Sequence, residues 1–134
     1  MTRTGRENHK RSFSLKARIN SFRDAFRGIA TLLRYEHNAR IHLFILVIVV
    51  IAGILLDISR SDWMAILFVS GLVFASECFN TAVEYLSDQI TEEQNENIRR
   101  AKDVAAAGVM ISAIISVLTG AIIFLPELFR LTGK

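Results

Sequence analysis

The stretch that decides the fold is Trp63 to Leu86, WMAILFVSGLVFASECFNTAVEYL. Its 24 residues are long enough to cross a membrane as a helix, because such a helix needs about 20 predominantly apolar residues. Two acidic residues, Glu77 and Glu84, nevertheless lie inside it. The stretch therefore predicts a membrane-spanning helix that carries polar groups within the membrane.

Two further apolar runs lie on either side of this stretch. Residues 41–56 (IHLFILVIVVIAGILL) and 104–125 (VAAAGVMISAIISVLTGAIIFL) contain no Asp, Glu, Lys or Arg. The sequence thus predicts an all-α integral membrane protein with spans over about 36–56, 63–86 and 104–125. We expect Pro126 to end the third span, because proline lacks an N–H and interrupts helical hydrogen bonding.

Composition and charge support one multi-pass membrane domain. The chain has 134 residues, of which 51% are hydrophobic, and its single cysteine excludes a disulfide framework. The N-terminal arm and the loop after the second span hold 13 of the 16 Lys and Arg residues, and the other loop and the tail hold three. Because basic residues are enriched in cytoplasmic loops, we expect the N-terminus to be cytoplasmic.

The arm before the first span is periodic as well as basic. Its apolar residues recur at alternating steps of four and three: Leu15, Ile19, Phe22, Phe26, Ile29 and Leu33. This spacing predicts an amphipathic helix over 13–34 that lies in the membrane interface. Packing of this helix on the protein's own bundle is the alternative. No nucleic-acid role is expected, since no DNA- or RNA-binding motif accompanies the basic residues.

These patterns divide the chain into three parts. We expect a flexible basic N-terminus over 1–12, a membrane domain over 13–126 and a short tail over 127–134.

The second span has a polar stripe, which we define as Glu77, Asn80, Glu84 and Asp88. On a helix the last three lie within about 60° of Glu77. An ionisable group deep in a bilayer costs at least a few kcal/mol, so the polar stripe must face protein, water or a cation. A structural pairing with arginines and an ion or proton path are alternatives to a catalytic role.

Charged residues precede the other two spans at the same membrane boundary. Glu36 and Arg40 precede the first span, and Lys102 and Asp103 precede the third. Carboxylate and amide oxygens suit Mg²⁺, and a lysine neutralises phosphoryl oxygens, so these groups favour chemistry on a phosphate. The sequence has neither GxxxxGK[ST] nor GxGxxG, the motifs typical of soluble nucleotide-binding folds.

The run from Glu77 to Asp88 has the pattern E-x-x-N-T-A-x-E-x-x-x-D and is followed by AKD at 101–103. These motifs and their spacing resemble the prokaryotic diacylglycerol kinase family, small enzymes with three spans in the bacterial inner membrane. Residues 36–42 (EHNARIH) and 122–126 (IIFLP) are similar to the Gram-positive branch of that family. This branch is associated mainly with undecaprenol phosphorylation.

The resemblance implies a homotrimeric bundle in the bacterial cell membrane, with sites shared between neighbouring subunits. It implies ATP- and Mg²⁺-dependent phosphorylation of a membrane lipid alcohol, with undecaprenol as the favoured substrate. A diacylglycerol kinase that makes phosphatidic acid is one alternative. A non-enzymatic membrane oligomer or an ion pathway is an alternative of another class.

The resemblance also implies roles for individual residues. Glu77 would be the general base, and Glu36 and Glu84 would hold Mg²⁺. Arg40 would contact the lipid substrate together with Glu77. The residues implied in ATP binding are Arg18, Glu36, Asn80, Glu84, Asp88, Glu93, Gln94, Asn95, Lys102 and Asp103.

Overall fold

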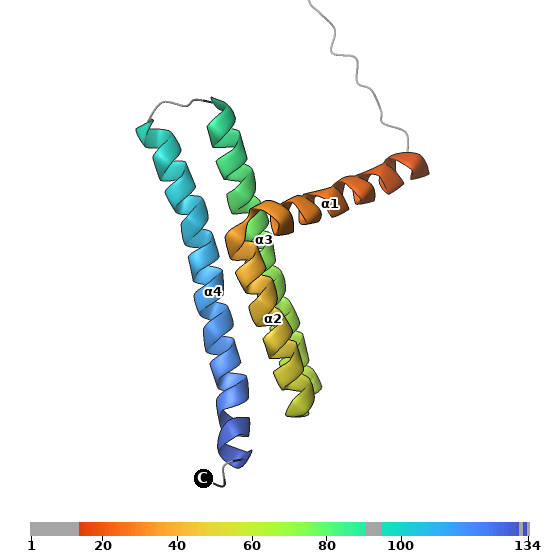
Figure 1. The fold of residues 1–134 in the computed structure, drawn as a ribbon, viewed down its shortest axis with the longest axis vertical. Helices are drawn as coiled ribbons and strands as arrows, with labels where there is room; N and C mark the ends of the chain where they lie inside the picture. Colours follow the sequence, from red (N-terminus) through yellow and green to blue (C-terminus); the bar gives the residue numbers. More distant parts are fainter. Residues whose placement is uncertain (1–13, 91–94, 132, 134) are drawn as a thin grey trace, which may run out of the picture.

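The structure is a computed structural model that describes residues 14–90, 95–131 and 133. The regular elements in this part of the chain are four helices: α1 (Leu15–Tyr35), α2 (His37–Leu55), α3 (Arg60–Ile90) and α4 (Glu96–Leu131). Figure 1 shows α2, α3 and α4 as long rods of similar direction, with α1 leaving them at a steep angle. The helices α2, α3 and α4 are long and apolar enough to cross a membrane, which confirms the all-α class and the three predicted spans.

A single residue separates α1 from α2. Glu36 has an extended backbone (φ −92°, ψ 118°), and its N–H donates to the carbonyl oxygen of Leu32. This break changes the direction of the chain, so α1 leaves the end of α2 at a steep angle (Figure 1). The helix predicted over 13–34 is present as α1, and Ser14 is its N-cap. Residues 1–12, predicted as a flexible N-terminus, lie outside the described residues.

The start of α3 is fixed by a reciprocal capping box between Ser59 and Asp62. The Asp62 N–H donates to Ser59 Oγ at 3.3 Å, and the Ser59 N–H donates to Asp62 Oδ2 at 3.1 Å. These bonds satisfy N–H groups that the first turn of a helix leaves without a partner. The helix therefore begins at Arg60, before the apolar run that predicted it.

The helix α4 is longer than the predicted third span at both ends. Asn95 Oδ1 accepts from the N–H groups of Asn97 and Ile98 at 2.9 and 3.3 Å, so the helix starts in the polar loop. The prediction that Pro126 ends the span is wrong, because α4 continues to Leu131. Pro126 removes one helical hydrogen bond, because it lacks an N–H, but the helix runs through it without ending.

The main packing contact joins α3 to α4, and α2 packs on α3. At the end of α2 that lies away from α1, the buried side chains of Ile58, Ile66 and Ile123 form a cluster. Gly53 allows close approach beside this cluster, since an added Cβ would lie 2.9 Å from Cη2 of Trp63. The three spans are thereby held together at this end.

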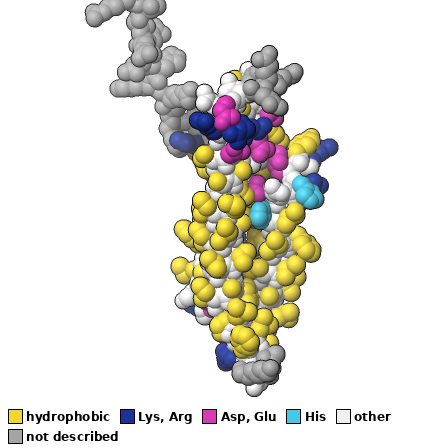
Figure 2. Space-filling view, turned by 90° about the vertical axis from the view of Figure 1, so that its left-hand side faces the viewer, with side chains coloured by type: hydrophobic (Ala, Val, Ile, Leu, Met, Phe, Trp, Pro, Cys, Tyr) yellow, Lys and Arg dark blue, Asp and Glu magenta, His cyan; other side chains and the backbone are white. Residues whose placement is uncertain are grey.

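The opposite end of the bundle, where α3 ends and α4 begins, we call the charged end. Figure 2 shows that most of the visible acidic and basic side chains gather toward it, above a body of exposed hydrophobic side chains. The exposed body includes many large aliphatic and aromatic residues of all three spans. Such a surface suits hydrocarbon, and the charged end suits water or lipid headgroups.

Candidate functional site

The polar stripe runs along α3 from the interior of the bundle to the charged end. Glu77 is 2% exposed and Asn80 is 9% exposed. Glu84 is half-buried, and Asp88 is exposed. The stripe therefore connects a buried carboxylate with the surface through a series of polar groups.

Glu77 meets a histidine of α2 inside the bundle. The Nε2 atom of His42 lies 3.2 Å from Oε1 of Glu77, and the His42 side chain is 21% exposed. Apart from this contact, Glu77 Oε1 has no hydrogen-bond partner within the described part of the chain. Sequence reasoning missed His42, because no periodicity relates positions on two different helices.

Two more carboxylates lie beside Glu77, each held by a hydrogen bond from α3. The Tyr85 hydroxyl donates to Glu36 Oε1 at 3.2 Å, and Asn80 Nδ2 donates to Glu84 Oε1 at 2.9 Å. Both carboxylates lie close enough to Glu77 to act on it electrostatically. The structure thus brings Glu36, from the α1–α2 junction, to the polar stripe.

An ion pair at the charged end joins α3 to α4. Lys102 Nζ donates to Asp88 Oδ1 at 2.8 Å. Lys102 also lies close enough to Glu84 to interact with it electrostatically. The structure therefore places this lysine beside the outer half of the polar stripe.

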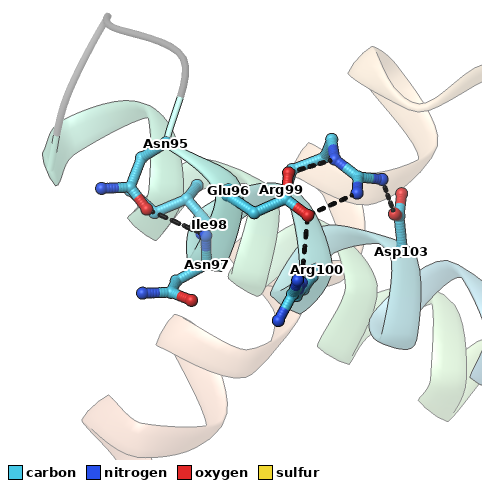
Figure 3. A network of polar contacts seen from close by, with 7 residues as sticks. All are labelled: Asn95, Glu96, Asn97, Ile98, Arg99, Arg100 and Asp103. Atoms are coloured by element: carbon cyan, nitrogen blue, oxygen red, sulfur yellow. Dashed lines mark hydrogen bonds and ion pairs between the residues drawn. The ribbon is translucent and has the colours of Figure 1, made fainter.

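Two other residues expected at the nucleotide have partners within α4. Asp103 Oδ2 accepts from Arg99 Nη1 at 2.7 Å, and Glu96 accepts from both Arg99 and Arg100 (Figure 3). Asn95 caps the same helix. In the single chain these groups form a network of hydrogen bonds at the start of α4. The ion pair between Lys102 and Asp88 is not part of this network.

The remaining expected residues are more distant or lie outside the described residues. Arg18 is near the start of α1, which projects away from the three spans, so the single chain does not bring Arg18 to the polar stripe (Figure 1). Arg40 is exposed in the first turn of α2. Glu93 and Gln94 lie outside the described residues.

The donor groups at the site fit Mg²⁺ only in combination with phosphate. Within residues 14–90 and 95–131, no three His, Cys, Asp or Glu side chains come close enough together to hold a metal ion. Mg²⁺ is typically bound by one or two carboxylates together with phosphate and water. Glu36 and Glu84 each accept a hydrogen bond at Oε1 and retain a second carboxylate oxygen. These two residues fit an ion that binds together with a nucleotide.

A cavity of about 230 Å³ lies between α2, α3 and α4 and has His42 in its wall. Most of its lining is apolar, including Ile45, Val69, Phe74 and Val117. An apolar space therefore adjoins the side chain that contacts Glu77.

Comparison with known proteins supports the motif-based resemblance. The sequence model of the family described as prokaryotic diacylglycerol kinase matches residues 23–124. The chain is 40% identical to the undecaprenol kinase of Bacillus subtilis over 82% of this chain and 89% of that protein. It is 35% identical to a diacylglycerol kinase of Synechocystis over 83% of this chain and 64% of that protein. It is 30% identical to a diacylglycerol kinase of Haemophilus influenzae over 79% of this chain and 91% of that protein.

Proposed function

The chain belongs to the prokaryotic diacylglycerol kinase family and is a membrane lipid kinase, and we propose that its preferred acceptor is undecaprenol, with diacylglycerol as the alternative. The identity is 40% to an undecaprenol kinase and 35% and 30% to two diacylglycerol kinases. The single observation that carries the catalytic assignment is the burial of Glu77 at the inner end of the polar stripe.

Glu77 is the general base for the lipid hydroxyl. Its side chain is buried within the bundle and the body around the bundle is apolar, so the access of water to this carboxylate is limited. As the hydroxyl oxygen bonds to the γ-phosphorus, the bond from phosphorus to ADP breaks and Glu77 takes the hydroxyl proton. Arg40, at the exposed start of α2, contacts the lipid headgroup region together with Glu77.

Glu36, Glu84 and Lys102 would position MgATP next to this base. Glu36 and Glu84 are oriented by Tyr85 and Asn80 and would hold the Mg²⁺ that accompanies the nucleotide, and Lys102 would face the phosphates. When bound, Mg²⁺ supplies positive charge that neutralises the phosphoryl oxygens. Lys102 adds a further positive charge at the outer half of the polar stripe.

The other ATP-binding residues come from the charged end and from α1. Asp88 orients Lys102, and Asp103 and Asn95 lie at the start of α4. Arg18, Glu93 and Gln94 complete the set that the family resemblance implies.

A homotrimer with shared sites accounts for two features of the single chain. Two buried side-chain oxygens, Asn80 Oδ1 and Thr81 Oγ1, lack a hydrogen-bond partner within the described residues, and Glu77 Oε1 has only its contact with His42. A buried polar atom without a partner costs about 1–3 kcal/mol, so donors from a neighbouring subunit or a substrate are expected. The start of α1 also projects away from its own bundle, where it can bring Arg18 to a neighbour's site (Figure 1).

The charged end faces the cytoplasm, where ATP is available, and α1 lies in the interface. Residues 1–40 and the first turns of α4 carry 13 of the 16 basic residues, which favours this multi-pass orientation in the bacterial cell membrane. The periodic apolar face of α1 and its basic residues fit the boundary between headgroups and acyl chains.

The acceptor is tested by measuring kcat/KM for undecaprenol and diacylglycerol in one mixed-micelle system with saturating MgATP. The Glu77→Gln variant provides the background rate in the same micelles. We expect a higher kcat/KM for undecaprenol. A clear excess for diacylglycerol would reverse the choice of acceptor, and no transfer to either lipid would contradict the assignment as a lipid kinase.

A further inference from the structure

Glu77 lies where a proton that it has accepted cannot easily leave. Its side chain is 2% exposed, whereas His42, which contacts it, is 21% exposed. After each phosphate transfer a general base must lose the proton before it can act again. The imidazole of His42 has a ring nitrogen that can accept a proton, and its side chain is the more exposed of the two.

We propose that His42 accepts from Glu77 the proton that Glu77 takes from the lipid hydroxyl, and so returns Glu77 to its ionised form after each turnover. The proposal rests on the proposed function, since it concerns the fate of the proton in that reaction. His42 acts through Glu77 and is therefore a positioning and proton-accepting residue.

The proton balance of this step is complete. The hydroxyl proton passes to a Glu77 oxygen as the oxygen–phosphorus bond forms, and the electron pair of the broken bond stays on ADP. The protonated carboxyl then transfers its proton to Nε2 of neutral His42, 3.2 Å from Oε1. This transfer leaves a carboxylate and an imidazolium, and the imidazolium releases a proton to water.

The other charged groups around this pair are carboxylates and cations at the charged end. Glu36, from the α1–α2 junction, and Glu84, from α3, both act electrostatically on Glu77. Arg40 lies two residues before His42 on α2, and the α4 residues that line the neighbouring cavity are not ionisable.

The cavity beside His42 makes the proposal directly testable. Because His42 forms part of the wall of the 230 Å³ cavity, replacing it with alanine enlarges a space that already exists. A free imidazole molecule can occupy that enlarged space and accept the proton in place of the side chain. Pyrazole has the same ring size and is a much weaker base, so it fills the space without accepting the proton.

The experiment measures lipid phosphorylation by the full chain carrying His42→Ala, with increasing imidazole or pyrazole. We expect kcat to fall about tenfold or more, because proton transfer to a positioned group contributes about 10²–10⁴-fold to a rate. We expect both KM values to stay within about twofold, since no phosphate or lipid contact is removed. Imidazole should restore kcat and pyrazole should not. Equal restoration by both, or no restoration by imidazole, would overturn the proposal.

Two further variants protect this test against a folding defect. His42→Asn keeps a polar side chain of similar length that cannot accept the proton, and it should lose kcat as His42→Ala does. His37→Ala removes an exposed histidine from the first turn of the same helix and should leave kcat unchanged. A fully active His42→Asn variant would overturn the proposal.

A measurement without turnover separates this proposal from the proposed function. The chain has three histidines, so their imidazole nitrogens can be followed by ¹⁵N NMR as the pH changes. The signals assigned to His42 should titrate differently in wild type and in Glu77→Gln, because the pair shares a proton. Superimposable curves would overturn the proposal. If the wild type phosphorylated neither lipid, the proposed function would fail, and these curves would still decide whether the pair shares a proton.

Discussion

Lys102 on α4 donates a hydrogen bond to Asp88 on α3 at 2.8 Å, across the charged end of the bundle. The Lys102 side chain is 37% exposed and that of Asp88 is 65% exposed. Ion pairs with this degree of exposure contribute only about 0–1 kcal/mol to stability. The pair therefore holds the lysine in position beside the polar stripe more than it stabilises the fold.

Lys102→Met should separate these two effects. We expect a Tm close to that of the wild type and a large loss of kcat/KM for ATP, because the charge that faces the phosphates is removed while the alkyl chain remains. Arg100→Met is the matched control, since Arg100 is an exposed cation of the same helix whose partner is Glu96. Equal losses of activity in the two variants would contradict a specific role for Lys102.

Glu84→Gln should raise the Mg²⁺ concentration needed for half-maximal activity as well as lower the maximal rate. The amide replaces a charged oxygen ligand with a neutral one, which Mg²⁺ binds less well. The measurement is a Mg²⁺ titration of lipid phosphorylation at fixed ATP. Glu96→Gln, which removes an exposed carboxylate from the network at the start of α4, is the control. An unchanged Mg²⁺ requirement in the Glu84→Gln variant would show that Glu84 is not a ligand of the metal ion.

Gly53→Ala should destabilise the contact between α2 and α3. An added Cβ would lie 2.9 Å from Cη2 of Trp63 and 3.0 Å from Cδ1 of Ile58. Overpacking of this kind costs about 1–3 kcal/mol. Thermal unfolding in detergent measures the effect, with Gly71→Ala as the control because its added Cβ would meet no atom within 4 Å beyond the neighbouring backbone of its own helix. A variant with wild-type Tm would show that Gly53 does not limit the packing.

The chain should be a homotrimer in mild detergent. The unpartnered buried oxygens of Asn80 and Thr81, and the outward course of α1, lead us to expect neighbours at the site. Native mass spectrometry combined with crosslinking measures the assembly. A monomer with full activity would contradict the shared site.

The spans were predictable because each is a long, predominantly apolar run, and hydropathy depends only on composition. Their ends were less predictable, since they depend on local hydrogen bonds. Ser59 with Asp62, and Asn95 at the next helix, start α3 and α4 in polar segments that hydropathy does not detect. Pro126 was expected to end a helix, but α4 continues beyond it to Leu131.

The candidate site was predictable where its residues share one helix. Helical periodicity placed Asn80 and Glu84 on one face of α3, and the structure joins them by a hydrogen bond. The contact between His42 and Glu77 could not be predicted in this way, because it depends on how two helices pack. The roles of these residues in catalysis stay predictions until they are measured.

The central claim, that buried Glu77 is the base for a lipid hydroxyl, is tested most directly by following transfer of labelled γ-phosphate from ATP into lipid by wild type and Glu77→Gln. Glutamine has nearly the same shape as glutamate but cannot accept the proton. We expect labelled lipid from the wild type and a rate lower by about 10²–10⁴-fold from the variant, with an unchanged Tm. Transfer at the wild-type rate by folded Glu77→Gln would contradict the claim.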